Sequence, residues 1–332
     1  MMIVVWLLTG CLLIFLMVII GGITRLTGSG LSITEWNVVM GTIPPINHQD
    51  WQIAFEKYQQ SPQFQKVNFD MKLEDFKSIF LWEYIHRLLG RLIGLVFLIP
   101  FLYFLITKKL EKSLIRKLLL LFALGGLQGF LGWFMVKSGL VNNPHVSHYR
   151  LAIHLLMAFI TFGLTFWIAL GLIYPHASTQ PSAPPKIIKT TSRVILLLVI
   201  VQIIYGAFVA GLHAGRIYNT FPKMGNEWIA EAVTALEPFW RNLTENLAGV
   251  QFVHRCIAWI LIGSIFLLWL LARNTHLTST QKKGINALLI IVILQFCLGV
   301  FTLFFAVPII LAVLHQVGAR SEERRVGKEC RL

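Results

Sequence analysis

Charged residues are scarce in this sequence. Asp, Glu, Lys and Arg make up 13% of its 332 residues, against about 25% in an ordinary soluble domain, and the mean hydropathy is +0.70. These values exclude an ordinary cytosolic enzyme and a disordered chain. Cysteine is rare as well, with four residues in the chain, which excludes a disulfide-stapled secreted protein.

The chain is nevertheless strongly basic, with a formal net charge of +14. In a polar chain, such a charge would suggest a nucleic-acid partner. Here the basic residues lie between long apolar runs, where the positive charge that flanks membrane-spanning helices explains them better. We therefore predict an all-α polytopic membrane protein that contacts the lipid bilayer and no nucleic acid.

Seven apolar stretches are long enough to cross a bilayer, which takes about 20 residues in a helix. They cover residues 3–23, 80–106, 118–136, 148–174, 193–212, 248–271 and 285–305. An eighth apolar run begins near Val307 and gives way after about Ala319 to the charged sequence RSEERRVGKECRL. We expect a truncated eighth span here, followed by a non-native tail at 320–332.

Basic residues are densest in three short connections between these spans. Those connections hold eleven Lys and Arg, whereas the longer alternate connections, at about 24–79, 137–147 and 213–247, hold nine. The positive-inside rule places the dense connections and the N-terminus in the cytoplasm. The long connections then lie outside, and we expect Trp228 and Trp240 to anchor an interfacial helix there.

The sequence contains a weak internal repeat. The segment EYIHR at 83–87 matches QFVHR at 251–255, and LAIHLL at 151–156 matches LAVLHQ at 311–316. Further similarity surrounds Gln128, Gln202 and Gln295. We therefore predict two tandem four-helix bundles of the same orientation, an N-terminal half at 1–175 and a C-terminal half at 176–319.

Four histidines, one in each even-numbered span, lie at a common depth. They are His86, His154, His254 and His315. Each lies about two turns into its span, which places it about 10 Å below the outer surface. Two histidines that face each other in a bundle are the arrangement that a bis-imidazole haem needs. The alternative is that each one only hydrogen-bonds between helices. A zinc site fits less well, because the sequence has no Cys and His cluster at ligand spacing.

Glu83 is the clear carboxylate in the outer half of a span, three residues before His86 and on the same helix face. It could form an ion pair with Arg87 or Arg91, or it could handle protons or stabilise charge beside a reactant. The C-terminal half has Gln251 at this position, which suggests that the two halves do different jobs.

Four arginines lie near the outer ends of spans, where they could bind the propionates of a haem. They are Arg25, Arg87, Arg150 and Arg255. Arginine pairs with carboxylates through two parallel hydrogen bonds, although extension of these side chains toward the lipid headgroups is an equally good interpretation.

Five segments resemble the haem A synthase family, in particular the form found in proteobacteria and mitochondria. They are GGITRLTGSGLSITEW (21–36), FKSIFLWEYIHRLLGR (76–91), SGLVNNPHVSHYRLAIHL (138–155), AGLHAGRIYNTFPKMG (210–225) and ENLAGVQFVHR (245–255). The resemblance implies an eight-helix, two-domain enzyme of the bacterial inner membrane with its haem sites toward the outer side. Its activity would be oxidation of the C8 methyl group of haem O to a formyl group, through a hydroxylated intermediate, which gives haem A for cytochrome oxidase.

The resemblance also implies roles for individual residues. His86 and His154 would flank the substrate haem, with Glu83 as the catalytic carboxylate, and His254 and His315 would ligate a haem b cofactor. Haem O synthase and cytochrome oxidase assembly factors are the implied partners, and a homo-oligomer is a further expectation. Truncation of the eighth span, which carries His315, would put haem b binding in question.

The residues alone leave two other functions open. A di-haem membrane cytochrome of the b type that only transfers electrons would use the four histidines equally well, but it leaves Glu83 unexplained. A haem transporter or chaperone would instead need exchangeable haem and no chemical change.

Overall fold

The computed structural model describes residues 1–35, 42–141, 144–174 and 185–318. Within these residues the chain is helical without β-strands, apart from one isolated bridge, and seven helices are long and apolar enough to cross a membrane. They are α1 (Met2–Leu26), α4 (Leu73–Ile106), α5 (Lys112–Gly139), α6 (His148–Ile173), α7 (Lys186–Gly211), α9 (Leu247–Arg273) and α10 (Ser279–Phe304). The predicted all-α polytopic class is thus confirmed.

Several helices begin well before the apolar stretch that predicts them. Helix α5 begins at Lys112 instead of residue 118, α7 at Lys186 instead of 193, and α10 at Ser279 instead of 285. The added turns carry much of the basic charge that the sequence assigned to loops. A helix satisfies its own backbone hydrogen bonds, so it can continue beyond the apolar core while its long basic side chains reach the interface.

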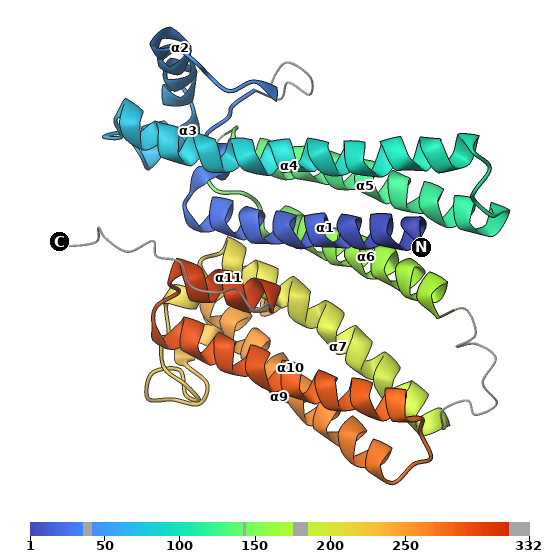
Figure 1. The fold of residues 1–332 in the computed structure, drawn as a ribbon. Helices are drawn as coiled ribbons and strands as arrows, with labels where there is room; N and C mark the ends of the chain where they lie inside the picture. The colour runs from blue at the N-terminus through green and yellow to red at the C-terminus, as the bar shows by residue number, and fades with distance from the viewer. Residues whose placement is uncertain (36–41, 142–143, 175–184, 319–332) are drawn as a thin grey trace.

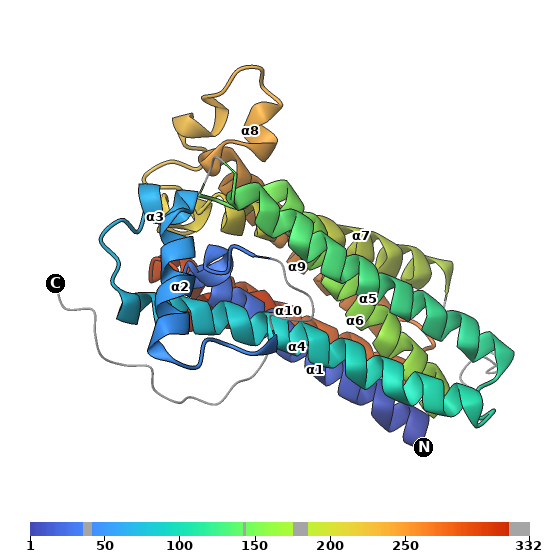
Figure 2. The same ribbon diagram turned by 90° about the horizontal axis from the view of Figure 1, so that it is seen from above.

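The helices form two groups that lie side by side (Figures 1 and 2). Helices α1, α4, α5 and α6 make one group, and α7, α9, α10 and the short α11 (Ile309–Val317) make the other. Between the groups, α6 packs on α7 and α1 packs on α11. The predicted boundary at 175–176 falls outside the described residues.

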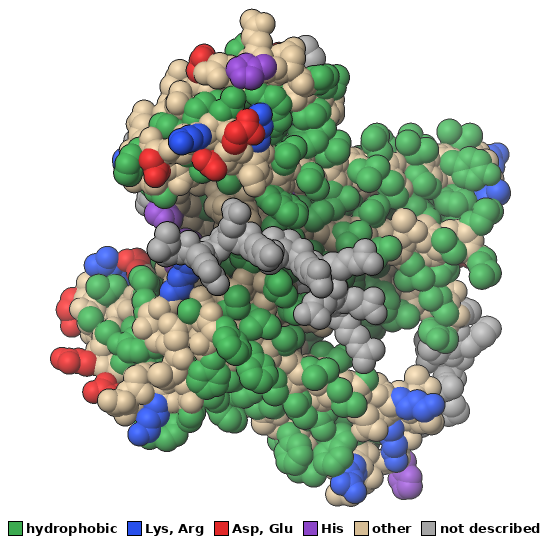
Figure 3. Space-filling view, turned by 60° about the vertical axis from the view of Figure 1, so that its left-hand side comes forward, with side chains coloured by type: hydrophobic (Ala, Val, Ile, Leu, Met, Phe, Trp, Pro, Cys, Tyr) green, Lys and Arg blue, Asp and Glu red, His purple; other side chains and the backbone are tan. Residues whose placement is uncertain are grey.

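Each group has its own buried core toward the end that the sequence places in the cytoplasm. In the first group, Trp6 and Leu7 of α1 pack against Phe104 of α4 and Leu118 of α5. In the second, Ile195 of α7 packs with Ile265 and Leu268 of α9. Hydrophobic side chains also cover the outer surface between charged side chains at the edges of the molecule (Figure 3), as expected of helices that contact lipid.

The connection between α1 and α4 folds over one end of the first group. It contains η1 (Ser29–Leu31), α2 (His48–Gln59) and α3 (Pro62–Lys66). Asn47 and Ser61 cap α2 and α3 with their side chains. Aromatic rings of α2 and α4 pack together beneath it, including Tyr58 on Phe76 with ring centroids 5.0 Å apart.

The connection between α7 and α9 does not form the interfacial helix that we expected. It consists of turns with three short helical segments, η4 (Ala214–Arg216), η5 (Glu231–Thr234) and α8 (Arg241–Thr244). Pro222 and Pro238 interrupt the segment, and proline has no backbone N–H to continue a helix. Trp228 and Trp240 are nevertheless exposed on its surface.

The eighth apolar run begins as predicted. Helix α11 starts after Pro308 and its described part ends at Gly318, which adopts a left-handed conformation. It packs against α10 and α1, and it carries His315 into the second group. The predicted tail at 320–332 lies outside the described residues.

Candidate haem sites formed by paired histidines

Each predicted histidine lies against a glycine of the preceding long helix. A Cβ atom added to that glycine would meet the imidazole ring, at 3.3 Å for Gly21 and His86, 3.2 Å for Gly132 and His154, 3.3 Å for Gly206 and His254, and 2.8 Å for Gly299 and His315. The missing side chain therefore makes the space in which each ring lies. We call these four glycine–histidine contacts the histidine cradles.

A glutamine accompanies three of the four cradles. Gln128, Gln202 and Gln295 each stand four residues before the cradle glycine, one turn away on the same helix face. Their Nε2 atoms lie 3.5 Å from Nε2 of His154, 3.3 Å from Nε2 of His254 and 3.2 Å from Nδ1 of His315, respectively. Gln128 and Gln295 also donate to the backbone carbonyls of His154 and His315.

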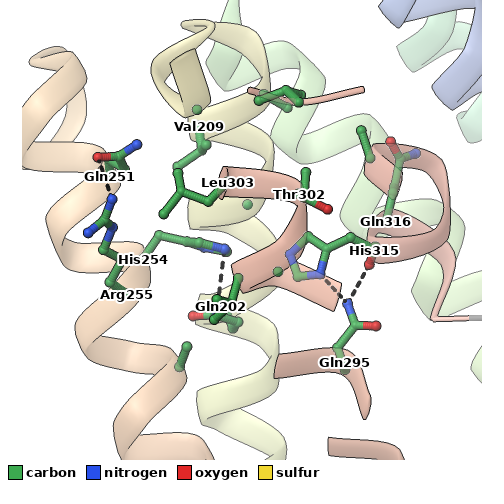
Figure 4. Close-up of a pocket in the computed structure, with 18 of the residues that line it drawn as sticks. Gln202, Val209, Gln251, His254, Arg255, Gln295, Thr302, Leu303, His315 and Gln316 are labelled. Atoms are coloured by element: carbon green, nitrogen blue, oxygen red, sulfur yellow. Dashed lines mark hydrogen bonds between the residues drawn. The ribbon is translucent and has the colours of Figure 1, made fainter. Parts of the chain in front are cut away.

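In the C-terminal group, His254 and His315 point into one space from opposite sides (Figure 4). Their ring centroids are 6.4 Å apart and their planes meet at 88°. Two imidazoles bound to opposite faces of one metal ion, each by a bond of about 2 Å, have ring centres about 6 Å apart. The separation therefore suits an iron between the two rings.

The surroundings of this pair also fit a haem. The rings line a cavity of about 310 Å³ between α7, α9, α10 and α11, which is at the lower end of ligand-pocket sizes. Within the described residues, Nδ1 of His254 and Oε1 of Gln202 and Gln295 are buried without a hydrogen-bond partner. Buried polar atoms without partners are rare in finished structures, which marks this cavity as a place for a bound group.

In the N-terminal group, His86 lies on α4 and His154 on α6, and each ring lies in its own glycine cradle. Nδ1 of His154 is buried and has no partner in the described part of the chain. The amide of Gln128 holds the backbone of His154 at 3.1 Å. The structure thus places both histidines of the first predicted pair on helices of the first group.

Glu83 is 2% exposed and accepts five hydrogen bonds. One carboxylate oxygen accepts from the backbone N–H of Ser32 (2.8 Å), its hydroxyl (2.7 Å) and the backbone N–H of Ile33 (2.9 Å). The other accepts from Nε and Nη2 of Arg87 at 3.1 and 2.7 Å. The ion pair with Arg87 is therefore present, and the carboxylate also fixes the loop that follows α1.

Gln251 makes the equivalent loop contact in the second group with the opposite polarity. Its Nε2 donates to the carbonyls of Ala214 and Tyr218, at 2.9 and 3.3 Å, and its Oε1 accepts from Nη2 of Arg255. The first loop presents N–H donors and needs an acceptor, whereas the second presents carbonyls and needs a donor. This difference gives the Glu/Gln asymmetry a local physical reason.

The four candidate propionate arginines divide into two kinds. Arg25 and Arg255 line the C-terminal cavity, and their buried Nε atoms have no hydrogen-bond partner among the described residues. Arg87 forms an ion pair with Glu83. Cζ of Arg150 lies 3.7 Å from the centroid of the Phe134 ring, and Nη1 of Arg150 donates to the backbone carbonyl of Phe134. Arg25 therefore reaches from α1 into the cavity of the other helix group.

Two further basic residues at this cavity were not predicted from the sequence. Arg216 and His213 line it beside Arg25. His213 lies outside the spans, and burial lowers the pKa of its ring, assisted by the positive charges of Arg25 and Arg216 and by His145. Arg25 and Arg216 make this end of the cavity suitable for an anionic group.

The glutamines and the cradle glycines are the other contacts that the sequence reasoning missed. Gln128, Gln202 and Gln295 were recognised as members of the repeat, but without a role. The signal that identifies them is the spacing Gln-x-x-x-Gly, which occurs in α5, α7 and α10. That spacing places the glutamine and the glycine on the face that meets the next histidine-bearing helix.

Comparison with known proteins shows the family of the chain. A family model described as "Cytochrome oxidase assembly protein" matches residues 4–321. The Heme A synthase of Flavobacterium johnsoniae is 50% identical over 321 residues, which cover 96% of this chain and 93% of that protein. The Heme A synthase of Nitrosomonas eutropha is 49% identical, with 96% and 89% covered, and that of Wolbachia pipientis wMel is 43% identical, with 94% and 87% covered. The chain therefore belongs to the cytochrome oxidase assembly protein family.

Proposed function

We propose that this protein is a haem A synthase, a membrane oxidoreductase that converts haem O into haem A for cytochrome oxidase. The reaction oxidises the C8 methyl group of haem O to a formyl group through a hydroxylated intermediate. The observation that carries the proposal is the facing pair of His254 and His315, with ring centroids 6.4 Å apart, together with a glycine cradle at each of the four predicted histidines. The near-complete match to relatives named Heme A synthase supports it.

We assign the C-terminal cavity to a haem b cofactor, which His254 and His315 would hold through its iron. The 6.4 Å ring separation and the unpartnered buried atoms support this assignment. When bound, the cofactor supplies electron transfer to and from the substrate site. Arg25 and Arg255, with their free Nε atoms, are the side chains suited to hold its propionates.

We assign haem O to the N-terminal site, between His86 and His154. Glu83 is our candidate for the catalytic carboxylate, one turn from His86 on α4. Its five hydrogen bonds give it two tasks: it holds Ser32 and Ile33 over the site, and it keeps a negative charge near the substrate. We further propose that Arg87 and Arg150 contact the haem O propionates at this side.

We also propose the bacterial inner membrane as the location, with the N-terminus in the cytoplasm and both haem sites toward the outer side. The basic first turns of α5, α7 and α10 support this orientation through the positive-inside rule. Haem O synthase is the expected supplier of substrate, and cytochrome oxidase assembly is the expected destination of the product.

The proposal is tested by mass analysis of haems extracted from membranes of a host that makes haem O but no haem A. Membranes that contain this chain should yield haem A or its hydroxylated intermediate, and membranes with empty vector should yield neither. If haem O remains unchanged while the purified chain holds only haem B, the protein is an electron-transfer cytochrome instead.

A further inference from the structure

The four histidine cradles are alike except at one position. In three of them, the residue four places before the cradle glycine is a glutamine whose amide contacts the imidazole ring. In the fourth, Met17 stands four places before Gly21, the glycine that cradles His86. The exception lies in the site that we assign to the substrate.

Met17 stands at the sequence position that a glutamine takes in the other three cradles. Its Cε atom lies 3.2 Å from the position of a Cβ on Gly90, one helical turn beyond His86 on α4. Its thioether therefore packs along the face of α4 that carries His86. In the described part of the chain, no side chain donates a hydrogen bond to the His86 ring or accepts one from it.

The amide and the methionine hold a neighbouring ring in different ways. A side-chain amide that hydrogen-bonds to a metal-ligating imidazole fixes the rotation of the ring and favours one tautomer. A thioether has three rotatable bonds and fills space without fixing an orientation. Oε1 of each glutamine is buried and unpartnered within the described residues, so the amide can also turn and accept from the ring.

We propose that the three glutamines are positioning residues that hold His154, His254 and His315 in place, and that His86, whose cradle has Met17 at the glutamine position, is the ligand that gives way when haem enters or leaves the N-terminal site. This inference rests on the proposed function, in which one haem is exchanged and the other stays. The distribution suits those roles: both rings of the C-terminal pair contact an amide, whereas in the N-terminal pair the His154 ring contacts an amide and the His86 ring has its glycine cradle alone.

The first test restores the missing amide. We would load the full-length chain with haem O in the host, purify it, and measure the rate of haem transfer to excess apomyoglobin, identifying each haem by mass. Met17→Gln should slow haem O release by about tenfold, the lower bound for changes in contacts that orient metal ligands. Met17→Leu keeps the packing without an amide and should release haem O at the original rate. Equal rates for the two variants would overturn the inference.

The second test removes an amide from the other site. Gln202 is the best target, because its one hydrogen bond in the described structure is to the His254 ring. Gln202→Met should speed haem b release by about tenfold and shift its low-spin electron paramagnetic resonance signal, while haem O release from the same molecules stays constant. An unchanged haem b rate and signal would contradict a positioning role.

These readouts remain separate from the proposed reaction. Release rates and spectra are measured whether or not haem A forms. If no haem A forms but Met17→Gln still slows release relative to Met17→Leu, the inference about His86 stands and the proposed function fails. If haem A forms and the two variants release haem O equally, the proposed function stands and the inference about His86 fails.

Discussion

At the residue scale, Glu83 and Gln251 illustrate what the sequence can reveal about a site. Both positions were identifiable as polar residues inside spans, three residues before a histidine. Their partners were not identifiable, because they lie far away in the chain. Ser32 and Ile33 are 50 or more residues from Glu83, and Ala214 and Tyr218 are more than 30 residues from Gln251. The polarity of a loop backbone depends on its conformation, which no local pattern specifies.

We expect Glu83→Gln to retain both haems and to lose most product. An amide at this position places N–H groups against Arg87 or against the N–H groups of Ser32 and Ile33, so the loop loosens and the negative charge disappears. Loss of a fixed electrostatic contact costs about 10²-fold in rate. Haem extraction from membranes measures product, and Glu74→Gln, which changes an exposed ion pair with Lys77, is the control. Normal haem A formation by Glu83→Gln would contradict the catalytic assignment.

His213 predicts a dependence of stability on pH. Burial and the nearby charges of Arg25 and Arg216 lower its pKa below the ordinary 6.5, so the folded protein binds this proton more weakly than the unfolded chain does. The free energy of unfolding should therefore fall as the pH drops below about 6.5. Thermal unfolding in detergent between about pH 7.5 and about pH 5 measures this, and His213→Gln should flatten the profile. A profile that is identical in the variant would exclude His213 as the cause.

At the scale of elements, the sequence predicted where the spans are but not where they end. Apolar length identifies a span because the bilayer needs about 20 such residues, and all seven predicted stretches are helical. The additional turns at Lys112 and Lys186 were missed because charged residues ended the apolar pattern while the backbone continued. The histidine cradles were missed for another reason: glycine in an apolar helix gives no local sign that a ring lies against it.

The cradle glycine Gly299 should be more sensitive to substitution than Gly263, a glycine of another long helix with open space around it. Gly299→Ala puts a Cβ within 2.8 Å of the His315 ring, so the ring must move and haem b occupancy should fall by about tenfold or more. Gly263→Ala in α9 meets nothing within 4 Å and should leave occupancy unchanged, with a gain in helix stability of up to about 1 kcal/mol. Haem content per purified chain is the measurement. Equal occupancy in the two variants would mean that the cradle does not position the ring.

At the scale of the whole molecule, side-chain hydrogen bonds connect the two helix groups. Arg25 of α1 donates to the carbonyl of Ala210 on α7 and lines the C-terminal cavity, and Gln316 of α11 contacts the carbonyl of Val18 on α1. The repeat predicted two similar bundles, but similarity between halves carries no information about the surface through which they meet. That surface brings a charge from one half into the cavity of the other, which provides a structural connection between the two proposed haem sites.

In the proposed function, the two histidine pairs bind different haems: His86 and His154 bind haem O, and His254 and His315 bind haem b. The most direct test is the identity of the haems that remain on the purified chain after one histidine of each pair is replaced, in a host that makes haem O. We predict that His254→Ala loses haem b and retains haem O, and that His154→Ala retains haem b and loses haem O and haem A. Loss of the same haem in both variants would contradict the claim.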